Sequence, residues 1–480
     1  MLIFIFYNIF VNILSFFIFD IFFEYNQNNF WVILHFNLLL SIIFYFYKNN
    51  FFSHITFILF LFSFYFFNLL GYFVNFFESI DNMRIISFAG ELLVSKTSML
   101  YSLKLLYIVI LVLFITYILF YRLFYKNYIC SHKRQFRTES IRIASISFYV
   151  MMFGSIFAFL KGIVLAWFVL KNGYLAMYLL ENNAFYLNPI IDIFDGFFFL
   201  GACSYYATNI PPNPPKEKII SILLLVYSFI ELLSGARRKF MSLALFIIWY
   251  KIKSANLNQS LIRKKFAIAI SSLFIIFISF MAFVGKIRLG KAVDLPYVDF
   301  ILDFLKKQNT TGRILALFFD YQKDIIPSYD GKLATLAPLR DFIANNSISR
   351  LFTEHIFYDR LQFMNIIKYL SMYISYMSFP LAFMTGGGLA SNYIAELYFD
   401  GGILLVVAYN IALSIIFAYF EINIKKKWGL SLIFMYIYPT LLYLPRNPAL
   451  SFLPMLLLPL IYILFMSVYI NLTGRRSYEN

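Results

Sequence analysis

The sequence is divided into apolar blocks separated by short polar connections. The blocks have the length of about twenty residues that a helix needs to cross roughly 30 Å of hydrocarbon. In lipid every backbone amide needs a partner within the protein, so only helices or a closed barrel can cross. Barrel strands alternate apolar and polar residues, and these blocks do not. The chain is therefore predicted to be an all-α polytopic membrane protein, and its 13% of charged residues agrees with this class.

About twelve blocks qualify as transmembrane helices. The first lacks a cleavage site of small residues and is expected to remain as a span. In chain order the blocks are 2–23, 30–47, 51–77, 101–121, 143–170, 189–208, 219–233, 240–250, 266–284, 401–420, 428–444 and 451–470. They predict an N-terminal bundle of about nine helices over 1–285 and a long loop over 286–400. Residues 401–480 then form about three helices and a short cytoplasmic tail.

Positively charged connections indicate the orientation of these helices. Residues 122–142 contain six Lys and Arg residues against one acid, and short connections rich in Lys and Arg remain in the cytoplasm. The connections 211–218, 251–265 and 425–427 fall on the same side when the predicted helices alternate. Both termini are then cytoplasmic. This topology explains the net charge of +16, and the partner that the charge implies is the anionic inner leaflet, so no nucleic-acid partner is expected.

The connection between 284 and 401 is predicted to leave the membrane on the outer face. Loops of this length seldom serve only as connectors. It holds polar, turn-rich sequence and then an apolar stretch at 366–384. A thirteenth span at 366–384 would place 425–427 outside, so we expect an interfacial helix there.

The long connection ends in a segment rich in small residues. This segment reads Gly386-Gly-Gly-Leu-Ala-Ser-Asn-Tyr-Ile-Ala-Glu-Leu-Tyr-Phe-Asp-Gly-Gly402 and continues directly into a predicted helix. A long outer loop late in a twelve-span chain, with a Glu-x-Tyr and a glycine pair at this place, resembles the Wzy-type O-antigen polymerase family. Residues 235–238 and 445–446 add a weaker similarity.

The resemblance implies an enzyme of the bacterial inner membrane whose active site faces the periplasm. Such a glycosyltransferase moves a growing glycan from polyprenyl pyrophosphate onto an incoming lipid-linked oligosaccharide repeat unit. The leaving group is already activated, so neither a metal nor a cofactor is expected. The partners implied are the polyprenyl-pyrophosphate-linked oligosaccharide, membrane lipids and a chain-length regulator.

This chemistry needs cations that hold the pyrophosphate as charge builds on it. Arginine suits the role because its planar guanidinium donates to two phosphate oxygens and stays charged. A charge in a very short turn beside the bilayer is costly unless it is used. Alternatively, such side chains only extend to lipid headgroups. The candidates are Arg237, Arg238 and Arg446 in short outer turns, and Arg288, Arg313 and Arg340 in the long loop.

The attacking sugar hydroxyl needs a base. Glu396 lies on the turn that enters a predicted helix, with Asp400 four residues later. The alternative is that one of these acids caps the helix, since acids favour that end. His355, the one histidine of the loop, is the rival base. Tyr398 is a candidate for stacking on a sugar ring.

Two other classes of function remain open. An O-antigen ligase shares this architecture and relies on a loop histidine. A lipid-linked oligosaccharide flippase or another transporter would use buried charges, such as Lys161 with Asp192 or Asp195. It would also show short outer loops and an internal repeat, which the sequence does not show. The two cysteines and four histidines are scattered, so no metal motif is visible.

Overall fold

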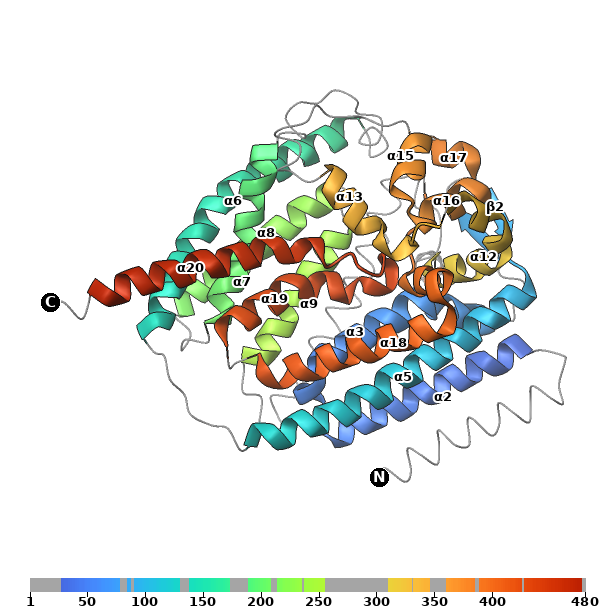
Figure 1. The fold of residues 1–480 in the computed structure, drawn as a ribbon, viewed down its shortest axis with the longest axis horizontal. Helices are drawn as coiled ribbons and strands as arrows, with labels where there is room; N and C mark the ends of the chain where they lie inside the picture. Colours follow the sequence, from blue (N-terminus) through green and yellow to red (C-terminus); the bar gives the residue numbers. More distant parts are fainter. Residues whose placement is uncertain are drawn as a thin grey trace.

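The structure is a computed structural model of the chain, shown in Figure 1. It describes residues 27–77, 84–87, 90–129, 138–172, 189–208, 214–234, 237–254, 310–329, 331–345, 360–384, 388–424 and 427–476. These residues are helical except for short connections and one antiparallel hairpin, in which β1 (Arg84–Ser87) pairs with β2 (Gly90–Leu93). The predicted class, a helical polytopic membrane protein, is confirmed.

The first helices form an N-terminal set and continue to the start of the long connection. They are α2 (Gln27–Lys48), α3 (Ile55–Asn68), α4 (Leu70–Phe77), α5 (Lys96–Ile129), α6 (Thr138–Asn172), α7 (Pro189–Ala207), α8 (Pro214–Leu233) and α9 (Arg237–Ser254). A 3₁₀ turn, η1 (Phe51–His54), precedes α3.

The remaining helices belong to the long connection and the C-terminal set. They are α12 (Thr310–Ile325), α13 (Ala337–Asn345), α15 (Arg360–Ile367), α16 (Leu370–Ser378), α17 (Pro380–Met384), α18 (Tyr393–Asn423), α19 (Trp428–Leu442) and α20 (Leu457–Arg476). Four 3₁₀ turns lie between them: η3 (Ile326–Tyr329), η4 (Ala334–Leu336), η5 (Leu444–Arg446) and η6 (Pro454–Leu456).

Seven helices of the described chain are long and apolar enough to cross a membrane. They are α2, α3 with η1, α5, α6, α7, α18 and α20. At the predicted spans 219–233, 240–250 and 428–444 the structure has the helices α8, α9 and the short apolar helix α19, which are not among these seven. The predicted spans 2–23 and 266–284 lie outside the described residues. The number of about twelve therefore stays a prediction.

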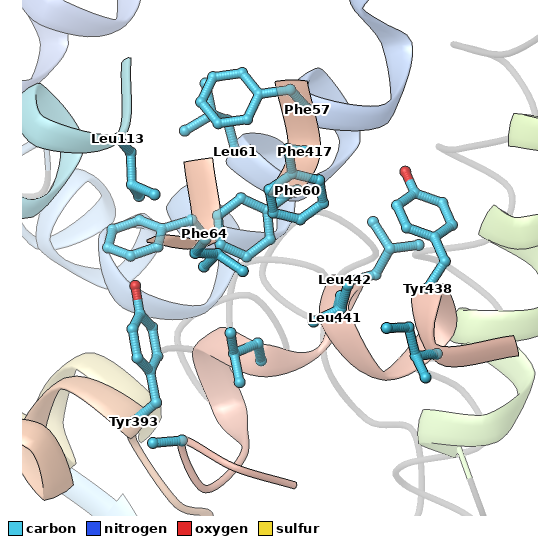
Figure 2. Packing of buried hydrophobic residues seen from close by; sticks show 14 of the residues in the cluster. Phe57, Phe60, Leu61, Phe64, Leu113, Tyr393, Phe417, Tyr438, Leu441 and Leu442 are labelled. Carbon is cyan, nitrogen blue, oxygen red and sulfur yellow. The ribbon is translucent and has the colours of Figure 1, made fainter. Parts of the chain in front are cut away.

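The centre of the bundle is packed with aromatic rings. Phe57 of α3 stacks on Tyr117 of α5, with ring centres 3.9 Å apart. Phe60 meets Phe417 of α18 at 4.7 Å, and Figure 2 shows the rings of Phe57, Phe60 and Phe417 close to one another. Aromatic pairs of this kind contribute about 0.5–1.5 kcal/mol each beyond their buried area. They hold α3 between α5 and α18.

Helices α6 and α7 are in close backbone contact. A Cβ at Gly201 would lie 2.5 Å from the backbone nitrogen of Met151, and one at Gly154 would collide with the backbone of Phe198. Small residues allow membrane helices to approach in this way. The contact sets the register in which side chains of α6 meet those of α7.

The helices of the long connection gather at one end of the bundle (Figure 1). Asp320 of α12 accepts hydrogen bonds from Ser95 Oγ at 2.5 Å and Ser98 Oγ at 2.7 Å, at the start of α5. The stretch 366–384, expected as one interfacial helix, is divided into the end of α15, then α16 and α17. Lys368 breaks it because its φ of 61° is left-handed and cannot continue a helix.

Helix α18 begins at Tyr393, earlier than the predicted boundary between 400 and 401. Its start is capped by Asn392, whose side-chain oxygen accepts from the amides of Ile394 and Ala395. Gly401 and Gly402 interrupt the helical dihedrals, and Gly402 has a φ of 60°. The glycine pair therefore marks a kink inside α18 rather than the entry to it.

Candidate functional site

Two turns that are far apart in the sequence meet at the end of α3. The guanidinium of Arg238, at the start of α9, lies 5.9 Å from the ring centre of Tyr443. The guanidinium of Arg446, at the end of η5, lies 5.5 Å from the ring centre of Phe67 in α3. The rings of Phe67 and Tyr443 are 5.1 Å apart. We call Arg238 and Arg446 the arginine pair.

The arginine pair brings like charges together. Desolvation by the surrounding protein atoms lowers the pKa of the Arg238 guanidinium, and the nearby charge of Arg446 lowers it further. The aromatic faces beneath them attract cations by about 0.5–1 kcal/mol at exposed sites. Arg238 is exposed and Arg446 is half-buried, so a ligand can reach both. An anion with several oxygens would relieve the repulsion and accept charge-assisted hydrogen bonds from both.

The turn that carries Arg446 is tightly bonded. Its amide donates to the carbonyl of Tyr443 at 2.8 Å, and the amide of Asn447 donates to Leu444 at 2.9 Å. Ser63 of α3 donates to the carbonyl of Leu442. These bonds join α3 to the end of α19 and hold Phe67 beneath Arg446.

Glu396 lies beside the same connection. Its side chain is fully buried in the first turn of α18. One carboxylate oxygen accepts from Ser391 Oγ at 2.6 Å, and the other accepts from the backbone amide of Ala449 at 2.8 Å. Ala449 lies three residues after Arg446 in the sequence, so the predicted base fastens the connection after the Arg446 turn to α18.

Asp400 has a different role from Glu396. Its carboxylate accepts from the amides of Ala334 and Thr335 at 2.7 and 2.8 Å, and from the Thr335 hydroxyl at 2.6 Å. It satisfies the first amides of η4, which precedes α13. Asp400 therefore caps a neighbouring element, while Asn392 caps α18.

The two loop arginines that the structure describes, Arg313 and Arg340, make contacts of their own. Arg313 is buried in α12, and its Nε has no hydrogen-bond partner among the described residues. Burial lowers the pKa of its guanidinium. Arg340 of α13 donates to the carbonyls of Ile367 at 2.8 Å and Leu333 at 3.0 Å. Arg340 thus ties α13 to the end of α15.

Several predicted site residues are not positioned by the structure. Arg288 and His355 lie outside the described residues. Arg237 begins α9, but its side chain also lies outside the description. Their predicted roles remain predictions.

Tyr398 is placed in an aromatic contact between helices. Its ring lies 5.2 Å from that of Phe319 and 6.2 Å from that of Phe318, both in α12. The ring is half-buried and packs α12 against α18. Stacking on a sugar remains a prediction for its exposed part.

Sequence reasoning missed the segment between α15 and α16. Lys368 is buried, and its Nζ donates to the carbonyl of Ser328 at 2.5 Å. The neighbouring Tyr369 donates to Asp341 of α13 at 2.9 Å. The one local signal was a lysine within the apolar stretch 366–384, which does not by itself predict a turn.

Lys161 forms an ion group with Asp192 and Asp195 in the helix bundle, which we call the ion group. Its Nζ lies 2.7 Å from Asp192 and 2.9 Å from Asp195. The predicted pairing is confirmed, and Lys161 meets both acids rather than one. Its charge is compensated within the protein.

Within the parts of the chain that the structure describes, no three His, Cys, Asp or Glu residues are grouped as metal ligands. The described architecture is that of a helical membrane protein with polar loop helices and paired arginines at one end. A family model described as O-antigen polysaccharide polymerase Wzy matches residues 4–475. The chain belongs to this family, which places it among the enzymes that polymerise glycans. No curated protein and no solved structure matches the chain.

Proposed function

We propose that this chain polymerises lipid-linked oligosaccharide repeat units into O-antigen or a related surface polysaccharide. The reaction takes place on the periplasmic face of the bacterial inner membrane. The growing glycan moves from its polyprenyl pyrophosphate to a sugar hydroxyl of an incoming repeat unit. Membership of the Wzy family supports the reaction class.

The arginine pair is the observation that carries the proposal. As the bond between the anomeric carbon and the pyrophosphate breaks, negative charge grows on the leaving oxygen. Arg238 and Arg446 lie together above the Phe67 and Tyr443 rings, where both can donate to that oxygen or its neighbours. This stabilisation by fixed cations makes the reaction independent of a metal.

The orientation of the chain is part of the proposal, because the lipid-linked unit is presented on the outer leaflet. Single cysteines at Ser328→Cys in η3 and Ser254→Cys at the end of α9 test it, in a background with Cys130→Ser and Cys203→Ser. A membrane-impermeant thiol reagent applied from the periplasm should label position 328 and leave 254 unlabelled. The reverse pattern would place the arginine pair in the cytoplasm and refute the proposal.

Deletion in the native host, followed by gel analysis of surface polysaccharide, tests the reaction. Loss of a polymerase leaves lipid A core that bears a single repeat. Loss of a ligase leaves core without repeats, and loss of a flippase causes the lipid-linked unit to accumulate inside. Expression of the intact chain in the deletion strain should restore the full ladder.

A further inference from the structure

The segment between α15 and α16 is held in a strained conformation. Lys368 has a left-handed φ of 61°, which costs a residue other than glycine about 1–2 kcal/mol. Three hydrogen bonds maintain it: its amide donates to Met364, its Nζ to Ser328, and its carbonyl accepts from Tyr329. Strain of this kind is concentrated at functional sites.

The strained turn presents Tyr369 to Asp341. The phenol of Tyr369 donates to one carboxylate oxygen of Asp341 at 2.9 Å. The side-chain amide of Asn345 donates to the other oxygen at 2.8 Å. Both Asp341 and Tyr369 are half-buried, so this oriented carboxylate is accessible from outside the protein.

Tyr369 also connects this carboxylate to the candidate functional site. It lies within electrostatic range of Arg340 and Glu396. It also lies within range of Arg238, one member of the arginine pair. The phenol of Tyr369 therefore has two charged neighbours: Asp341, from the long loop, and Arg238, from the helix bundle.

We infer that Asp341, oriented by Tyr369, accepts the proton of the attacking sugar hydroxyl, an inference that rests on the proposed function. The hydroxyl oxygen forms a bond to the anomeric carbon of the donor glycan. The bond between that carbon and the pyrophosphate oxygen breaks, and its electron pair leaves with the lipid pyrophosphate. The hydroxyl proton passes to a carboxylate oxygen of Asp341 and later to water.

The hydrogen bonds of the two acids favour Asp341 over Glu396 for this step. Both oxygens of Glu396 accept bonds from the protein, and its side chain is fully buried. A substrate would have to break one of these bonds to reach it. Asp341 is bonded by two side chains that leave part of its surface open. Burial and the adjacent carboxylate raise the pKa of Tyr369, so the phenol stays protonated and donates to Asp341.

The test compares full-length variants in membranes from the deletion strain, which supply the host's own lipid-linked repeat units as the probe. Asp341→Asn should lower the initial rate of polymerisation about 100-fold, the lower end of the range for losing a general base. The apparent KM for the repeat unit should change less than threefold, because the arginine pair is intact. Asp341→Glu should recover part of the rate, since it restores a carboxylate.

Two further variants separate chemistry from folding. Asp324→Asn removes an exposed carboxylate of α12 and should leave the rate unchanged. Tyr369→Phe keeps the ring but removes the phenol, and should lower kcat about tenfold if a hydrogen bond orients the base. If Asp341→Asn does not accumulate as a folded protein, unchanged kcat in Tyr369→Phe at normal abundance overturns the inference.

The outcomes also separate this inference from the proposed function. An intact chain that fails to polymerise in these membranes refutes the proposed function itself. If the intact chain polymerises and Asp341→Asn keeps at least half of the rate of the intact chain, only the role of Asp341 is refuted. A 100-fold loss that Asp341→Glu partly restores supports both.

Discussion

The arginine pair and the ion group around Lys161 compensate charge in opposite ways. Lys161 lies within 3 Å of two carboxylates in the helix bundle, so its charge is satisfied inside the protein. Arg238 and Arg446 instead lie over aromatic rings, and the charge of each guanidinium disfavours the charge of the other. We propose that the first arrangement is complete without a ligand and that a bound anion stabilises the second. We therefore expect a binding site where the fold brings like charges together, at the arginine pair.

Replacement of Arg446 should have the largest effect and tests the functional side of this comparison. Arg446→Ala removes one of the two cations that we propose face the leaving pyrophosphate. We expect about a 100-fold loss of polymerisation rate, which corresponds to about 2.7 kcal/mol. The surface polysaccharide should show single-repeat product at normal protein abundance.

A matched control for Arg446 is Lys171 at the end of α6. Its Nζ lies 5.2 Å from the ring centre of Trp167, so it is also a cation over an aromatic ring. Lys171→Ala should leave the polysaccharide ladder unchanged. Full-length ladders from Arg446→Ala would remove Arg446 from the site.

Replacement of Lys161 tests the structural side of the comparison. Lys161→Ala leaves Asp192 and Asp195 close together without their shared cation. We expect a loss of about 2 kcal/mol in the free energy of unfolding, below the 3–5 kcal/mol of fully buried pairs because these groups are partly exposed. Unfolding by SDS in mixed micelles measures it, and the rate per folded molecule should change little.

The comparison would fail if the charges of the ion group were needed for activity. Lys161→Met combined with Asp192→Asn and Asp195→Asn removes all three charges together. This variant should recover most of the lost stability and keep the wild-type rate. Loss of polymerisation at normal stability would show that the ion group takes part in function, as a transporter would require.

Asn392 gives the smallest expected effect and separates the scaffold of the site from its charges. Its side chain caps α18 and donates to Asn68 and Thr311, each at 3.0 Å. Asn392→Ala should lower the free energy of unfolding by about 1 kcal/mol, as for other lost caps. Asn392→Asp keeps the capping oxygen but cannot donate to Asn68 and Thr311, so it should lose at least as much stability as Asn392→Ala.

The rate per folded molecule should be nearly unchanged in Asn392→Ala, because the arginine pair keeps its aromatic support. A loss of rate as large as that of Arg446→Ala would show that the position of α18 limits catalysis. Unfolding in mixed micelles and polymerisation in the same membranes provide both measurements.

Local sequence determined the helices and the class of this protein. A span is recognised by its length and apolar composition, which need no knowledge of distant residues. The described helices accordingly cover ten of the twelve predicted blocks, and the other two lie outside the description. The resemblance at 386–402 indicated the family that the family model shows. The arginine in each short turn was also identifiable, because its position beside an apolar block is a local property.

Only the tertiary structure decided which of these groups meet. Arg238 and Arg446 are neighbours because α3 places Phe67 beside Tyr443, a contact between distant parts of the chain. One of the two hydrogen bonds to Glu396 likewise comes from a distant part of the chain, the backbone amide of Ala449. Periodicity reports which face of a helix is apolar, but not which helix packs on that face. For the same reason the break at Lys368 and its presentation of Tyr369 to Asp341 followed from long-range contacts, not from local composition.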